Sequence, residues 1–179
     1  MQLAFNHIGF FVEDLSQMTR FYTDVLQFTL TDAGGLGASH LSFLSRNPDD
    51  HHQIVLVSGK PAGRPFNSIN QISFKVPDLA SLRQVYLRLK QACVQDLVSV
   101  THGNAISVYC LDPEGNRLEI FLNTPWYCTQ PTREAIDIFL PDEQVLAQAE
   151  AIASRSPCFM PREVWKQSMA QKMSQQEGR

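Results

Sequence analysis

The sequence lacks the cysteine pairs that build zinc clusters or disulfide frameworks. Its four cysteines, Cys93, Cys110, Cys128 and Cys158, are widely spaced and include no CxxC pair, so we interpret them as reduced thiols. It also lacks an excess of positive charge, because 15 lysines and arginines stand against 18 aspartates and glutamates, a formal net charge of −3. Without a basic stripe, a nucleic-acid partner is not expected.

Long apolar runs and a leader-like start are missing as well. No run approaches the roughly 20 apolar residues that a membrane span needs, and the opening segment MQLAFNHIGFF has neither a basic start nor a cleavage-like site. We therefore expect a cytoplasmic protein without a membrane partner. The 179 residues, 44% of them hydrophobic and 18% charged, are enough to bury one core and are typical of a globular protein.

An internal repeat organises the chain. When the sequence is shifted by 64 positions, residues 5–28 align with residues 69–92 with eight identities. Each copy runs from an apolar, strand-like segment to an aspartate, Asp14 or Asp78, and then to apolar residues at helical spacing. An aspartate in this place is typical of a helix N-cap, because its carboxylate accepts hydrogen bonds from amides of the first turn.

Three further strands are predicted after the helix in each copy, separated by turn segments rich in glycine, proline, asparagine and aspartate. They are expected at 28–32, 39–45 and 53–58 in the first copy and at 95–100, 105–111 and 117–122 in the second. The sequence thus predicts an α+β fold. Two βαβββ modules pair into one curved mixed sheet, with helices outside and a concave face left for a ligand.

The repeat divides the chain into four parts. These are a first module (1–58), a linker of sequence GKPAGRPFNS (59–68), a second module (69–122) and a C-terminal extension (123–179). The extension starts with an irregular, proline-interrupted segment and continues with helical patterns over about 142–154 and 161–174. These two helices either cover the modules or pair two chains, so a homo-oligomer is among the arrangements that they allow.

Repeat-related positions in the first and last strand of each module can face one centre. They are His7 and Val55 in the first module, and Gln71 and Glu119 in the second. An ionisable side chain between apolar neighbours in a strand costs free energy unless it is paired or bound to a metal. His7 and Glu119 are therefore candidate metal ligands. The alternatives are a hydrogen-bonded core residue for His7 and a solvated or arginine-paired strand residue for Glu119.

Four segments of residues 4–122 carry a family resemblance: NHIGFFVEDLSQMTRFYTDVLQF, HHQIVLV, INQISFKV and HGNAISVYCLDPEGNRLEIF. They resemble the vicinal oxygen chelate superfamily, which includes glyoxalase I, extradiol ring-cleaving dioxygenases and antibiotic-resistance proteins. The similarity is greatest to single-domain extradiol dioxygenases related to biphenyl-2,3-diol 1,2-dioxygenase. The resemblance implies that O2 cleaves the ring of a catechol-like aromatic substrate at an Fe(II) centre, or at Mn(II) or another divalent metal.

The resemblance places the metal ligands at His7, Gln71 and Glu119. Extradiol enzymes use two histidines and one glutamate, so Gln71 departs from their pattern by offering an amide oxygen in place of an imidazole. Val55 cannot coordinate a metal, which argues against the four-ligand arrangement of glyoxalases.

The resemblance also implies three catalytic residues. His52 corresponds to the acid/base histidine, His102 to the histidine aimed at bound O2, and Tyr109 to a substrate-binding tyrosine that stabilises developing charge. Each residue type has a plainer interpretation: His51 and His52 in an exposed polar turn, Tyr109 as a core aromatic, and His102 as part of a turn before Gly103.

Other functions stay open at this point. A non-catalytic protein of the same fold would bind a planar apolar ligand, and Gln71 and Val55 favour it because neither is a strong metal donor. A metal-dependent isomerase or epimerase needs a different pair of proton-handling residues and has no positive signal in the sequence.

Overall fold

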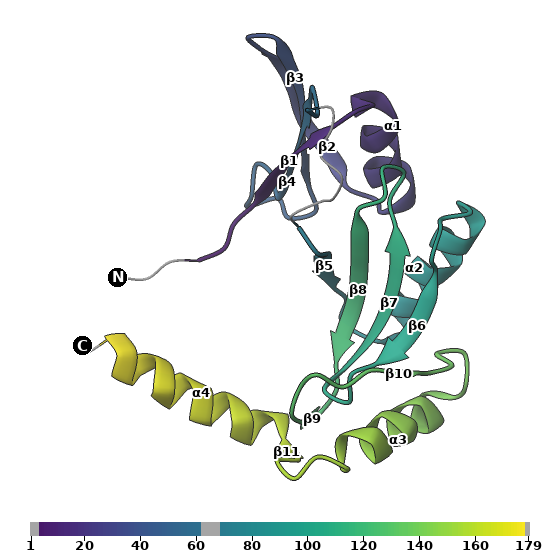
Figure 1. The fold of residues 1–179 in the computed structure, drawn as a ribbon, viewed down its shortest axis with the longest axis vertical. Helices are drawn as coiled ribbons and strands as arrows, with labels where there is room; N and C mark the ends of the chain where they lie inside the picture. The colour runs from purple at the N-terminus through teal and green to yellow at the C-terminus, as the bar shows by residue number, and fades with distance from the viewer. Residues whose placement is uncertain (1–3, 62–68, 178–179) are drawn as a thin grey trace.

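The computed structural model describes residues 4–61 and 69–177, and most of the expected linker lies outside them. Within these residues the two βαβββ modules are present (Figure 1). The strands of the first module are β1 (Ile8–Val12), β2 (Thr29–Leu36), β3 (Ser39–Ser45) and β4 (Ile54–Ser58). Those of the second are β5 (Ile72–Lys75), β6 (Val98–Thr101), β7 (Ala105–Leu111) and β8 (Arg117–Asn123).

The helix of each module begins at the predicted aspartate. Asp14 accepts a hydrogen bond from the Gln17 amide (2.8 Å) before α1 (Leu15–Arg20), which continues as the π-helix η1 (Phe21–Val25). Asp78 accepts from the Ser81 amide (2.8 Å) before α2 (Leu79–Gln91). Both N-cap predictions are confirmed, because the carboxylates satisfy first-turn amides that have no partner within the helix.

The strand register repeats the shift of 64 residues. In the first module Gly9 pairs with Val55, and in the second Ser73 pairs with Glu119. The strand orders are β1-β4-β3-β2 and β10-β6-β7-β8-β5. In the described part of the chain these ladders form two separate sheets, so the single curved sheet that the sequence predicts is divided in two.

Two strand predictions need correction. β2 continues through Gly34 and Gly35 to Leu36, where the sequence indicates a turn, because pairing with β3 holds this glycine-rich segment extended. The sheet of the second module gains β10 (Glu134–Ala135) from the extension, which pairs with β6. Hydrophobic patterning does not predict a two-residue strand of this kind.

The modules meet at the turn between β7 and β8. The Glu114 carboxylate accepts from the amides of Glu13 (2.7 Å) and Asp14 (2.9 Å) and pairs with Lys60 (3.2 Å). Nearby, the buried Tyr22 hydroxyl donates to Asp112 at 3.4 Å. Burial and the neighbouring carboxylate raise the pKa of Tyr22 well above its usual range. The turn therefore fixes the second module against the end of β1.

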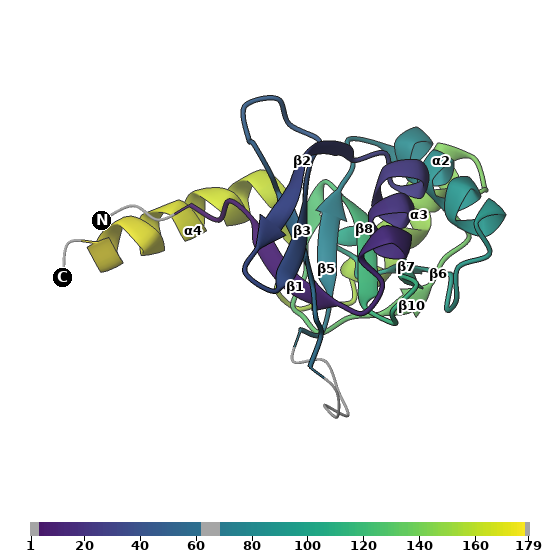
Figure 2. The same cartoon turned by 90° about the horizontal axis from the view of Figure 1, so that it is seen from above.

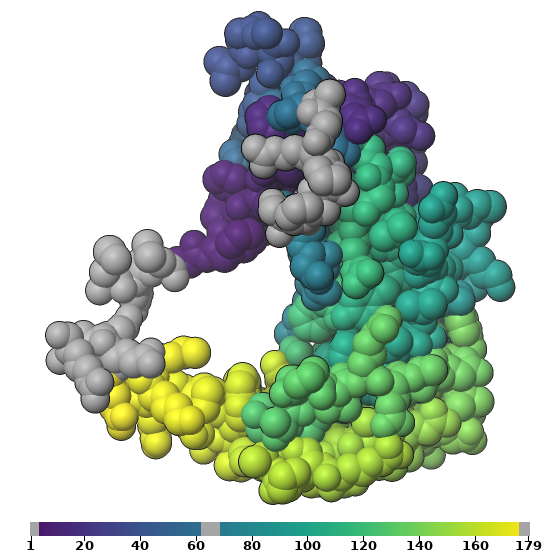
Figure 3. Space-filling model, viewed as in Figure 1, coloured from purple at the N-terminus to yellow at the C-terminus, as the bar shows by residue number. Residues whose placement is uncertain are grey.

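The extension packs one helix on the second module and projects another. Val145, Ala149 and Ile152 of α3 (Asp142–Ala153) enter the core. The strands β9 (Trp126–Tyr127) and β11 (Met160–Pro161) pair and lead into α4 (Arg162–Glu177), which extends away from the sheets (Figures 1 and 2). Figure 3 shows the face between the first module, the second sheet and α4 deeply hollowed. Over residues 4–61 and 69–177, no helix combines the length and apolarity that crossing a membrane requires.

Candidate functional site

A buried carboxylate, Glu119 on β8, lies at the centre of a network of polar side chains. Its Oε2 atom accepts from the Ser73 hydroxyl (2.6 Å) and from Nε2 of Gln71 (3.0 Å). Its Oε1 atom accepts from the hydroxyls of Ser107 (2.8 Å) and Tyr109 (2.7 Å). Glu119 is 8% exposed, and four donors offset the cost of removing its charge from water.

Strand register brings these donors together. Glu119 pairs with Ser73 of β5 on one side and with Tyr109 of β7 on the other. Gln71 and Ser107 lie two residues from those partners, and alternate residues of a strand point to the same face. We call Gln71, Ser73, Ser107, Tyr109, Glu119 and the adjacent His102 the polar centre.

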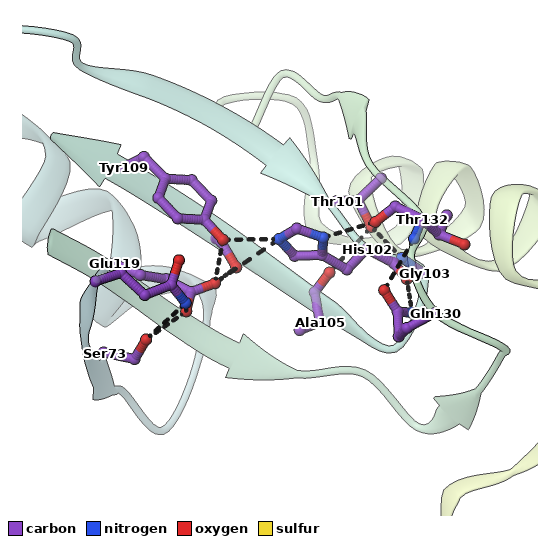
Figure 4. A network of polar contacts seen from close by, with 11 residues as sticks. Ser73, Thr101, His102, Gly103, Ala105, Tyr109, Glu119, Gln130 and Thr132 are labelled. Atoms are coloured by element: carbon purple, nitrogen blue, oxygen red, sulfur yellow. Dashed lines mark hydrogen bonds and ion pairs between the residues drawn. The ribbon is translucent and has the colours of Figure 1, made fainter. Parts of the chain in front are cut away.

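His102 follows β6 and extends the network (Figure 4). Its Nδ1 atom lies 2.6 Å from the carbonyl oxygen of Thr132, and its Nε2 atom lies 3.0 Å from the Tyr109 hydroxyl and 3.7 Å from Oε1 of Glu119. A carbonyl only accepts, so Nδ1 carries a proton. The Tyr109 hydroxyl donates its own proton to Glu119, so a proton on Nε2 of His102 donates to the Tyr109 oxygen and lies within ion-pair distance of Glu119.

Tyr109 remains a hydrogen-bond donor in this network. Burial, followed by the hydrogen bond to Glu119 and its negative charge, raises the pKa of Tyr109 well above its usual range. The guanidinium of Arg133 lies over the Tyr109 ring, 5.4 Å from its centroid. The phenol therefore keeps its proton at neutral pH and can donate it to an anionic oxygen.

The C-terminal extension holds His102 in place. The His102 carbonyl accepts from Nε2 of Gln130 (2.8 Å) and from the Cys128 thiol (3.2 Å). Gly103 has a φ of 74°, and the Thr124 hydroxyl donates to its carbonyl (2.7 Å). The extension thus supplies both the acceptor for the His102 ring and the contacts that fix its backbone.

Three histidines of the first module form a second cluster. The rings of His7 and His52 lie with centroids 4.4 Å apart, and the Nδ1 atoms of His51 and His52 are 3.0 Å apart. The exposed His7 ring also contacts the Asn6 side chain at 2.9 Å. Desolvation by burial, followed by repulsion from His7 and His51, lowers the pKa of His52. His52 is consequently neutral over more of the pH range than an isolated histidine.

The structure thus divides the predicted site residues between two clusters. Gln71, His102, Tyr109 and Glu119 meet in the polar centre, whereas His7 lies with His52.

Among residues 4–61 and 69–177, no hydrogen bond, ion pair or ring contact joins His7 to Glu119. The same residues include no group of three histidine, cysteine, aspartate or glutamate side chains arranged to hold a metal ion. Their convergence on one ion stays a prediction: His7 contacts Asn6 and His52, and Glu119 contacts the donors of the polar centre. Val55, opposite Gly9, is a buried apolar residue.

Sequence reasoning missed four residues of the site: Ser73, Ser107, Thr132 and Arg133. Ser73 could have been found, because the repeat and the parallel pairing of first and last strands place it opposite Glu119. Thr132 and Arg133 lie in the irregular segment of the extension, where neither periodicity nor the repeat indicates a contact with the second module.

Comparison with known proteins gives one family and one curated relative. Residues 4–120 match the model of the Glyoxalase/Bleomycin resistance protein/Dioxygenase superfamily. Biphenyl-2,3-diol 1,2-dioxygenase 3 of Rhodococcus globerulus is 28% identical over 119 residues, which are 64% of this chain and 60% of that relative. The chain therefore matches somewhat less than two thirds of the relative's length.

Solved structures share the fold. A glyoxylase/bleomycin resistance protein/dioxygenase domain from Frankia superposes with a TM-score of 0.60 at 21% identity, covering 69% of this chain and 99% of that domain. The fosfomycin resistance protein FosX of Listeria monocytogenes, in complex with Mn(II) and sulfate, superposes with a TM-score of 0.54 at 19% identity. That match covers 69% of this chain and 95% of FosX.

Proposed function

The chain belongs to the glyoxalase/bleomycin resistance/dioxygenase superfamily, and we propose that its polar centre binds a small hydroxylated aromatic molecule of the catechol type. The observation that carries the proposal is the shared oxygen Oε1 of Glu119, which lies 2.7 Å from the Tyr109 hydroxyl and 3.7 Å from Nε2 of His102. A ligand hydroxyl that replaces one of the four donors of Glu119 would donate to the carboxylate, and the phenol and imidazole beside it would then donate to a ligand oxygen.

A recess beside the polar centre supports an aromatic ligand of modest size. A cavity of about 220 Å³ borders the Tyr109 ring, with Val98, Arg117 and Arg133 in its wall. Arg117 and Glu119 are alternate residues of β8 and point to the same face. The guanidinium groups and the tyrosine ring offer flat surfaces on which an aromatic ring stacks.

The superfamily implies a divalent metal, and the predicted ligands can be compared with the donors that such a metal takes. Gln71 and Glu119 lie side by side, but Nε2 of Gln71 donates to the carboxylate and His7 packs on His52. Fe(II) in oxygenases takes two imidazoles and one carboxylate on one face of an octahedron. The predicted set of His7, Gln71 and Glu119 differs from that pattern at Gln71, which offers an amide oxygen in place of the second imidazole.

The enzymatic form of the proposal is extradiol ring cleavage with O2 as co-substrate, dependent on Fe(II) or Mn(II). It is supported by the similarity to the Rhodococcus dioxygenase and by the contact between Tyr109 and Glu119. The lowered pKa of His52 would keep this imidazole neutral, as a base must be, but acid/base work by His52 would also require that its cluster face the ligand at the polar centre. Tyr109 and His102 would then contact the substrate oxygens.

The non-catalytic form is binding of the same ligand without metal. It is favoured by Gln71, an amide where extradiol enzymes have an imidazole, which donates to Glu119 at 3.0 Å. In this form Glu119, Tyr109 and His102 recognise the hydroxyl groups, and the ligand leaves unchanged.

The deciding experiment measures metal content and catechol binding in protein purified without air. The variants are His7→Ala, Gln71→His and Tyr109→Phe, with Tyr86→Phe on α2 as the matched tyrosine control. In the enzymatic form, His7→Ala loses metal, Gln71→His binds it at least about tenfold more tightly, and catechol gives a yellow ring-fission product. In the binding form, metal-stripped protein binds catechol, and Tyr109→Phe weakens binding about tenfold while Tyr86→Phe and His7→Ala leave it unchanged.

One outcome contradicts both forms of the proposal. If catechol fails to bind in a saturable manner to metal-loaded and metal-stripped protein alike, the polar centre does not recognise hydroxylated aromatics.

A further inference from the structure

A cleft of about 590 Å³ lies at the junction of the two modules. The first module contributes residues 25–28, at the end of η1 and just after it, together with Arg46 and Gln53. The second module contributes β5 and one face of α2 from Ser81 to Arg88. The cleft shares Ser73 with the polar centre but is otherwise built from different residues. We propose that this junction cleft binds a small anion with an apolar body, an aromatic carboxylate, as a second site beside the one described above.

The charged side chains that line the cleft are all positive. Arg46, Lys75 and Arg88 line it, and no aspartate or glutamate is among its described lining residues. Three like charges around one cleft repel one another, and the repulsion is relieved when an anion enters. Guanidinium groups pair with carboxylates through parallel hydrogen bonds, which favours this class of anion.

Gln27 positions both arginines of the cleft, and it does so with neutral acceptors that leave their charges uncompensated. Nη1 of Arg46 donates to the backbone carbonyls of Leu26 (2.5 Å) and Gln27 (3.2 Å). The side-chain oxygen of Gln27, with the amide oriented so that it faces the guanidinium, accepts from Nη1 and Nη2 of Arg88 at 2.9 and 3.0 Å. Gln27 thus joins Arg46 of the first module to Arg88 of the second. All these acceptors are neutral, so both positive charges remain available to a ligand that finds them already ordered.

Lys75 supplies the third charge at the end of β5. Among the described residues no hydrogen bond or ion pair engages its ammonium group, and its side chain is exposed at the cleft. It can therefore turn toward a bound anion without breaking an existing contact.

The apolar part of the cleft indicates the rest of the ligand. Phe28 and Phe74 meet edge to face with ring centroids 5.5 Å apart, and Val25, Val85 and Ile120 complete the wall. A bare inorganic anion would leave this wall in water, whereas an aromatic ring covers it and contributes about 25 cal/mol per Å² of apolar surface buried. The volume is within the range of small-molecule sites.

The test uses 2-naphthoate as the probe and neutral 2-naphthamide as its isostere, titrated by calorimetry into the full chain. We expect saturable binding of 2-naphthoate, and binding of the amide about tenfold weaker or worse. Lys75→Met should weaken naphthoate binding about three- to tenfold, and Arg88→Met by a similar factor. Lys90→Met is the matched control, because Lys90 is an exposed cation of α2 that does not line the cleft, and it should leave affinity unchanged.

Several outcomes overturn the inference. If 2-naphthoate and 2-naphthamide bind with equal affinity, the positive charges of the cleft do not recognise the ligand. If Lys75→Met and Lys90→Met weaken naphthoate binding equally, the ligand does not bind in the cleft. If inorganic phosphate binds as tightly as 2-naphthoate, the apolar wall of the cleft does not contribute to binding. Tyr109→Phe must leave naphthoate binding intact, and catechol must not displace naphthoate. If catechol binds and naphthoate does not, this inference fails while the proposed function stands.

Discussion

At the scale of single residues, related positions of the two modules carry side chains of opposite character. Val55 and Glu119 occupy related places in their ladders, opposite Gly9 and Ser73. The valine is a buried apolar residue, while the glutamate is buried with four hydrogen-bond donors around it. A buried charge is tolerated where its partners are provided. The donors around Glu119 therefore mark a polar site in the second module, whereas the related position of the first module is the apolar Val55.

The lowered pKa of His52 predicts how the free energy of unfolding depends on pH. Its pKa in the folded state lies below its ordinary value near 6.5, so between these two pKa values the unfolded chain binds more protons than the folded one. The contribution of neutral His52 is therefore complete above the unfolded pKa and is lost as pH falls through the window below it. We expect His52→Gln to lose less unfolding free energy than the parent between about pH 7 and about pH 5.

Urea unfolding at several pH values measures this difference. His40→Gln is the matched control, because His40 lies on β3 away from the cluster of His7, His51 and His52. A His52→Gln variant whose stability falls with pH as steeply as that of the parent would show that His52 does not govern this range.

At the scale of elements, the loop from β6 to β7 is packed so closely by the extension that it requires glycine. A Cβ atom added to Gly103 would lie 2.6 Å from the Cys128 sulfur and 3.1 Å from Ala153, at a φ of 74°. Gly115, in the turn from β7 to β8, has a similar φ of 79° with nothing within 4 Å of an added Cβ. Replacing each of these two glycines by alanine therefore distinguishes the cost of backbone strain, common to both, from the cost of crowding, which only Gly103 meets.

Alanine at these positions should give unequal losses of stability. Gly115→Ala meets backbone strain alone and should cost about 1 kcal/mol. Gly103→Ala adds overpacking against α3 and Cys128 and should cost about 2–4 kcal/mol. Urea denaturation compares them, and the shift of His102 resonances in Gly103→Ala reports the accompanying movement of the ring. Equal costs for the two variants would contradict close packing of the extension on this loop.

At the scale of the whole molecule, one carboxylate joins the two modules. Glu114 side-chain oxygens accept from two amides at the end of β1 and pair with Lys60, while its own side chain is 7% exposed. Glu13 pairs with the same lysine from a side chain that is 73% exposed. Desolvation lowers the pKa of Lys60, but the hydrogen bonds and negative charges of Glu114 and Glu13 together outweigh it and raise the pKa above its usual value.

The two glutamates should differ sharply when replaced. Glu114→Ala leaves two backbone amides without their charged acceptor and should cost about 2–3 kcal/mol. Glu13→Ala removes an exposed ion pair and should cost no more than about 0.5 kcal/mol. Thermal and urea unfolding compare the variants. If Glu114→Ala is as stable as Glu13→Ala, the modules are held together by apolar contacts such as Phe28 against Phe74 and not by this turn.

The duplicated fold was open to prediction because its signals are local. The aspartate caps, the helical spacing after them and the register shift of 64 all arise from contacts between residues close in sequence or from the repeat itself. β2 was predicted too short, because pairing with β3 outweighs the preference of Gly34 and Gly35 for a turn.

The site divides in the same way. The sequence by itself determined that Gln71 and Glu119 occupy the repeat-related places of the first and last strand of the second module. The register that brings Ser73 and Tyr109 beside Glu119 came from the structure. Only the tertiary structure decided that Thr132 holds the His102 ring and that His7 packs on His52. Those contacts depend on how the extension and the two sheets settle against one another, and that packing is set by the summed burial of many side chains far apart in the chain.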